Sequence, residues 1–108
     1  MSVQAFVGEF LTFLEQREER LLSWGFYNVR WTIPEIEEAF ASEAPVGLQT
    51  RWAALASQGH SIQSLLLQMR QRSLIYQVPN SDGSYCTRFA EGVRLLASLR
   101  QMFKVDDW

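Results

Sequence analysis

The hydrophobic period of this chain changes at Arg72. Over residues 61–72 apolar side chains recur at the three- and four-residue spacing of a helix, whereas residues 74–78 and 85–89 alternate with a period of two. The two alternating runs flank the stretch PNSDG, which is rich in turn-forming residues. A helix followed directly by a β-hairpin is therefore predicted, and this order restricts the fold more than any other feature of the sequence.

Helical periodicity also occupies most of the remaining chain. TIPE indicates a helix start, because Thr32 can cap, Pro34 suits the first turn and Glu35 completes a capping box. Ser61 is a second candidate cap, and residues 26–32 are expected to be a short strand or an extended connector. Helices are predicted over residues 2–24, 33–43, 61–72 and about 90–103, and Gly25 caps the first of them. A further helix, third in the chain, turns Leu48, Trp52, Leu55 and Ala56 inward and ends at Gly59.

The element order is that of a winged helix-turn-helix. We therefore expect a mainly α single domain with a small β-hairpin and a winged helix-turn-helix-like layout, spanning residues 1–108. The tail KVDDW leaves Trp108 behind two acids, so we expect the chain to be the N-terminal part of a longer protein.

The first half of the chain also predicts which side chains meet water. Residues 15–20 are expected to lie largely on the wet side of their helix, as are Glu35, Glu37 and Glu38 on theirs. Three of the four tryptophans are expected to anchor the core, because an aromatic ring buries a large area in a small domain. They are Trp24, Trp31 and Trp52.

Charge is unevenly distributed, although the net charge is only −2. Residues 1–45 hold eight acidic and three basic side chains, and residues 46–108 hold four acidic and seven basic ones. A generally basic, nucleic-acid-coating protein is excluded, but the second half can face an anion and the first half a basic partner. The single cysteine and the lack of a long apolar run favour a cytoplasmic protein without a membrane partner.

No constellation of groups for a chemical reaction is found in the sequence. One histidine, His60, and one cysteine, Cys86, cannot form a four-ligand zinc site, and neither a phosphate-binding loop nor a nucleophile elbow is present. Cys86 is expected to pack inward or at a strand edge. The sequence therefore predicts no catalytic residue, metal or cofactor, and the chain is not expected to be an enzyme by itself.

The helix over 61–72 has an outward face that fits two kinds of partner. Gln, Ser and Arg side chains can read base edges or hold phosphates. Leu67 cannot do so, and indicates docking against protein or contact with a thymine methyl. Arg88, on the hairpin, can hold a phosphate or pair with Glu91, whereas Asp82 at the turn opposes a phosphate. The candidate DNA-contacting residues are Gln63, Ser64, Gln68, Arg70, Gln71, Arg72 and Arg88.

The segment YCTRFAEGVRLLASLRQMF, residues 85–103, resembles a passage in large bacterial helicase-type proteins of the DEAD/DEAH superfamily. In those proteins a hairpin ending in Arg-Phe/Met-Ala-Glu runs into a helix of the form VRLLxxLRQxF, and SIQSLLLQMRQRSLIYQVP is similar in pattern as well. The resemblance covers roughly half of the chain. It implies an N-terminal accessory domain ahead of ATP-dependent motor domains in a phage-defence or DNA-processing system, although the motor motifs are missing here.

The last helix also carries candidate docking residues. Arg94 can pair with Glu91, and Arg100 falls inside the apolar arc, where a charge needs a partner from a downstream domain or another subunit. Two hypotheses follow: an accessory domain that contacts DNA for a helicase-type motor, or a protein-docking or dimerisation module built on Leu67, Arg94 and Arg100. A free-standing transcription regulator is disfavoured by the negative net charge.

Overall fold

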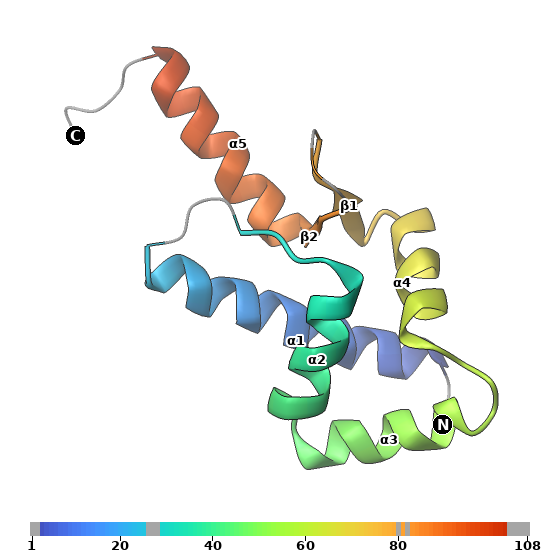
Figure 1. The fold of residues 1–108 in the computed structure, drawn as a ribbon. Coiled ribbons are helices and arrows are strands. Elements are labelled where there is room, and N and C mark those ends of the chain that lie inside the picture. The colour runs from blue at the N-terminus through green and yellow to red at the C-terminus, as the bar shows by residue number, and fades with distance from the viewer. Residues whose placement is uncertain (1–2, 26–28, 80, 82, 104–108) are drawn as a thin grey trace.

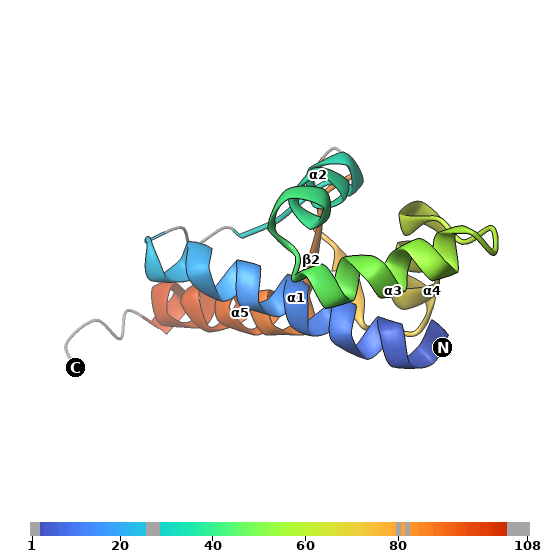
Figure 2. The same cartoon turned by 90° about the horizontal axis from the view of Figure 1, so that it is seen from below.

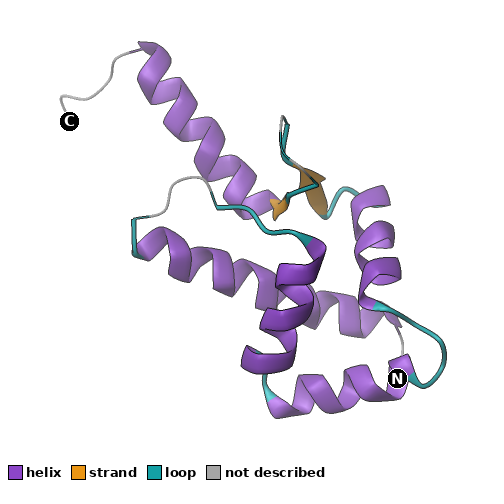
Figure 3. Ribbon diagram, viewed as in Figure 1, coloured by secondary structure: helices purple, strands orange, loops and turns teal. Residues whose placement is uncertain are grey.

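The computed structural model describes residues 3–25, 29–79, 81 and 83–103, apart from the side chains of Arg94 and of residues 97–103. It is mainly helical with one two-stranded antiparallel hairpin, which confirms the predicted winged helix-turn-helix-like layout (Figures 1 and 3). The elements are α1 (Val3–Ser23), α2 (Ile33–Glu43), α3 (Val46–Ala56), α4 (Ile62–Gln71), β1 (Ile75–Gln77), β2 (Tyr85–Thr87) and α5 (Arg88–Phe103).

Local chemistry sets several helix boundaries as predicted. The Thr32 hydroxyl accepts from the Glu35 amide at 3.4 Å, and the Ser61 hydroxyl accepts from the Ser64 amide at 3.1 Å. Gly25 and Gly59 have φ values of +95° and +97°, which glycine adopts without steric cost. Helices α3 and α4 are thus joined by a tight turn.

The hairpin is shorter than the alternating pattern predicted. Strands β1 and β2 pair Ile75 with Thr87 and Gln77 with Tyr85, and Arg88 already belongs to α5. On the other side of β2, Trp31 exchanges backbone hydrogen bonds with Tyr85, at 2.9 and 2.7 Å. The predicted extended connector therefore pairs with β2 through the single residue Trp31. Strand β2 lies between β1 and this connector.

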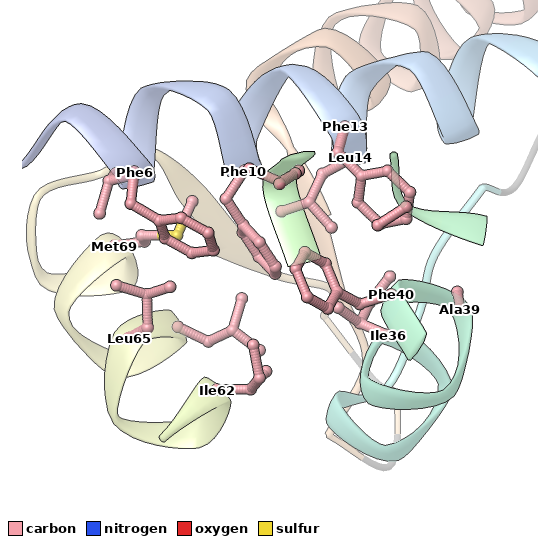
Figure 4. Close-up of a cluster of buried hydrophobic side chains, with 14 of the residues drawn as sticks. Phe6, Phe10, Phe13, Leu14, Ile36, Ala39, Phe40, Ile62, Leu65 and Met69 are labelled. Atoms are coloured by element: carbon pink, nitrogen blue, oxygen red, sulfur yellow. The ribbon is translucent and has the colours of Figure 1, made fainter. Parts of the chain in front are cut away.

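Helix α1 supplies the central apolar stripe of the core (Figure 4). Phe10 and Phe13 pack on Phe40 of α2, with ring centroids 5.4 and 5.8 Å apart, and Phe6 packs on Trp52 of α3 at 5.3 Å. Four buried side chains of α4 complete this core: Ile62, Leu65, Leu66 and Met69. The helix-turn-helix is therefore held on the first half of α1.

A second, smaller cluster joins the wing to the other half of α1. Its buried members are Val29, Val78, Cys86 and Ala90, and Leu21 and Leu22 of α1 pack against them. The buried position of Cys86 confirms the inward packing that was expected. From this contact α5 diverges from α1 in the view of Figure 1, and in the view of Figure 2 it lies behind α1.

The three tryptophans behave differently from one another. Trp31 is buried and Trp52 packs partly buried against the core, as predicted. Trp24 is 68% exposed, so its prediction as a core anchor was wrong. It follows the last residue of α1, beyond Leu21 and Leu22 of the second cluster, and among the described residues no element buries the ring.

The prediction that residues 15–20 face water was wrong for Glu18, which is fully buried. One carboxylate oxygen, Oε2, accepts from Trp31 Nε1 at 2.9 Å and from the Thr87 amide at 2.8 Å, while Oε1 contacts the Thr87 hydroxyl. Glu18 thereby joins α1, the connector before α2 and the end of β2. Because a buried carboxyl group is costly without hydrogen bonds, these three contacts make its position tolerable.

Burial raises the pKa of the Glu18 carboxyl above the ordinary glutamate value, and the hydrogen bonds from Thr87 and Trp31 oppose that rise only in part. The folded protein therefore binds this proton more tightly than the unfolded chain does. The stability that the proton confers is fully present below the unfolded-state pKa and is lost as pH rises through the folded-state pKa.

We expect Glu18→Gln to remove this pH dependence. The amide has the shape of the protonated carboxyl, so it can accept from Trp31 and from the Thr87 amide and donate to the Thr87 hydroxyl. Urea unfolding at about pH 5 and about pH 8 should show that the free energy of unfolding falls less with pH in Glu18→Gln than in the wild type. Exposed Glu19→Gln is the control, and equal pH dependence in all three proteins would contradict the assignment.

Candidate nucleic-acid interface

Helix α4 exposes every side chain that the sequence assigned to its outward face. The apolar side chains of α4 face the core (Figure 4), and Ser61 caps the opening turn, which fixes the rotation of the helix. Leu67 lies among the polar residues and is 53% exposed. The exposed set is Gln63, Ser64, Leu67, Gln68, Arg70, Gln71 and Arg72.

The chain passes from α4 into β1 through a compact turn. Ser73 has φ +59°, a left-handed conformation that closes a helix and that a residue with a Cβ adopts at some cost. Its amide donates to the Arg70 carbonyl at 3.0 Å, and the Leu74 amide donates to the Met69 carbonyl at 2.9 Å. The end of α4 and the base of the wing are therefore joined by backbone hydrogen bonds.

Arg88 joins this junction from the start of α5. Its Nη2 donates to the Ser73 carbonyl at 3.2 Å, and its Nε donates to the Tyr76 hydroxyl at 3.3 Å. Arg70 and Arg72 end α4 just before Ser73, and Arg88 reaches Ser73 from α5, so the three belong to this junction and we refer to them as the wing-base arginines. Sequence reasoning missed Ser73 and Tyr76, whose partner lies 15 and 12 positions further along the chain.

Of the two alternatives for Arg88, the pairing with Glu91 is not found among the described residues. Arg88 hydrogen-bonds to Ser73 and Tyr76, and the Glu91 carboxylate accepts from the Cys86 thiol at 3.6 Å. The start of α5 at Arg88 explains the change, because it turns the arginine back toward the end of α4.

The other predicted site residues are only partly placed. Asp82 at the wing tip, and the side chains of the docking candidates Arg94 and Arg100, lie outside the described residues. On the same helix Leu95 and Leu96 are 59% and 58% exposed, so part of the apolar pattern of α5 faces solvent.

The sequence of the helix-turn-helix itself carries no acidic residue, although Glu9 of α1 pairs with Arg51 of α3 at 2.8 Å. Between Glu43 and Asp82 the chain contains no aspartate or glutamate, and this stretch includes all of α3, α4 and β1 together with three arginines. The outward face of α4 thus offers amide, hydroxyl and guanidinium groups, and neither α4 nor the elements that adjoin it in sequence, α3 and β1, carry a carboxylate. Such a surface can bind an anion.

The described part of the chain contains no group of three or more side chains that could hold a metal ion. A search of the same residues for a helix long and apolar enough to cross a membrane also found none. Comparisons with protein-family models, with curated proteins and with solved structures find no match to this chain. The resemblance to helicase-type proteins therefore stays a prediction.

Two adjacent leucines on α4 test which face of this helix is buried and which is exposed. Leu66→Ala removes a side chain that is 98% buried and should lower the free energy of unfolding by about 2–5 kcal/mol, whereas Leu67→Ala should lower it by less than about 0.5 kcal/mol. Urea denaturation of both variants measures the difference. Equal losses would mean that Leu67 packs inside the fold and that this face of α4 is not free.

Proposed function

We propose that this domain is a non-catalytic accessory module that contacts DNA through the outward face of α4 and the wing-base arginines. The observation that carries the proposal is that arginines and exposed glutamines lie together on a helix-turn-helix whose own sequence contains no acid. Winged helix-turn-helix domains that bind DNA use this helix for base edges and neighbouring groups for phosphates. The net charge of −2 does not oppose such contact, because no acidic residue lies on α4 itself.

The resemblance of residues 85–103 to helicase-type proteins supplies the context of the proposal. An accessory domain of this kind positions DNA for an ATP-dependent motor, whose downstream domains or partner subunit are its protein partners. The cytoplasm is the proposed compartment, in agreement with a single, buried cysteine. Within the helix face, Leu67 fits the methyl group of a thymine.

A second candidate function is docking or dimerisation without DNA. It is favoured by the exposure of Leu67, Leu95 and Leu96, which are 53%, 59% and 58% exposed. Adjacent exposed leucines such as Leu95 and Leu96 of α5 are more typical of a protein interface than of a phosphate-binding face. A concentration-dependent dimer in light scattering, together with no affinity for DNA, would select this alternative.

We expect the domain to bind short DNA with an affinity that falls as salt rises, because phosphate contacts release counterions. Fluorescence anisotropy between about 50 and about 200 mM salt should show this slope, and Arg70→Ala/Arg72→Ala should weaken binding and lower the magnitude of the slope by about 2. The double variant removes two of the three wing-base arginines without touching a buried side chain.

Arg17→Ala/Arg20→Ala is the matched control. It also removes two positive charges, from a part of α1 where both arginines lie near Glu43 of α2, at 3.8 and 3.9 Å. The control should keep the wild-type slope. Equal weakening by both double variants would show general charge attraction and contradict an interface at α4.

A further inference from the structure

A cavity of about 260 Å³ adjoins the proposed interface, between the first turns of α1, the turn before α4 and the end of α4. Its floor is apolar and includes Val7 and Met69, both buried. Its polar lining consists of Gln4, His60, Gln68 and Arg72.

The lining is rich in hydrogen-bond donors and contains no carboxylate. Gln4 and Gln68 each carry an amide NH2 group, Arg72 carries a guanidinium and His60 a ring N–H. Three other cavities of the described chain are each lined by at least one glutamate. The cationic Arg72 without an opposing carboxylate therefore favours an anion, and its charge-assisted hydrogen bonds suit a phosphate as well as a carboxylate.

The size and the floor of the cavity define the rest of the ligand. Inorganic phosphate alone would leave the apolar floor unused, while sites for drug-sized ligands occupy about 300–1,000 Å³ and are larger than this cavity. A single sugar or base ring attached to the phosphate matches the space.

We propose that this cavity binds a nucleoside monophosphate group, with the phosphate on Arg72, His60 and the two glutamines and the ring over Val7 and Met69. Gln68 and Arg72 belong both to the cavity and to the outward surface of α4, so the group can be the 5′-phosphorylated end of a DNA strand held at the interface. A DNA end as the source of this group rests on the proposed DNA contact. A free nucleotide is a second source that presents the same phosphate and ring.

The test compares single-stranded oligonucleotides with a 5′-phosphate and with a 5′-hydroxyl in fluorescence anisotropy. Wild-type protein should prefer the phosphorylated strand by about tenfold, as expected for hydrogen bonds to a charged group. His60→Ala and Gln4→Leu should abolish the preference and leave duplex binding unchanged, because neither residue lies on α4. Arg70→Ala, which lies outside the cavity, should weaken duplex binding and keep the preference.

A parallel titration of the isotope-labelled protein with deoxyadenosine monophosphate, followed by amide chemical shifts, separates the two sources. Shifts around His60 and Gln68 without a preference for the phosphorylated strand assign the cavity to a free nucleotide. If neither the shifts nor the preference were observed, the inference would be overturned. If Arg70→Ala still weakened duplex binding in that case, the proposed function would stand without the cavity. Loss of duplex binding alone, with nucleotide shifts retained, would overturn the DNA contact and keep the cavity.

Discussion

The buried carboxyl group of Glu18 is the contact on which the arrangement of the wing depends. It binds the Trp31 ring from the connector before α2 and both the amide and the hydroxyl of Thr87 at the end of β2. Thr87 is followed by Arg88, and β2 pairs with β1, which follows α4 after a short turn. One side chain of α1 therefore fixes the position of the wing, the start of α5 and one of the wing-base arginines. Loss of its hydrogen bonds would leave a buried polar group unsatisfied and release these elements from α1.

The proposed interface depends on how the fold distributes its packing clusters and its acidic residues. The helix-turn-helix packs on the aromatic first half of α1, and the wing packs on the second half through a smaller cluster. The acids of the first half of the chain lie on α1 and α2, whereas the stretch from residue 44 to residue 81 has none. A protein with a negative net charge can thus present a locally positive face, and the arginines at the end of α4 lie where that face meets the wing.

Much of this fold can be predicted from the sequence, because it depends on local signals. The period change at Arg72, the caps Thr32 and Ser61, and the rotation of α4 follow from neighbouring residues. Contacts between distant residues could not be read in this way: Arg88 bonds to Ser73 and Tyr76, and Trp24 projects past the core. Glu18 was recognisable in principle, since it continues the spacing of Phe10 and Leu14 along the apolar stripe of α1. Its charge hid that signal, because glutamates are rarely buried without partners.

We propose that α4 and the base of the wing form a single DNA-contacting surface. Amide chemical-shift mapping of the isotope-labelled domain during titration with a short DNA duplex at low salt tests this proposal. We expect shifts along the outward side of α4 and at Ser73 and Tyr76, with little change along α2. Shifts gathered on the acidic side of α1 and α2, or no shifts at all, would contradict it.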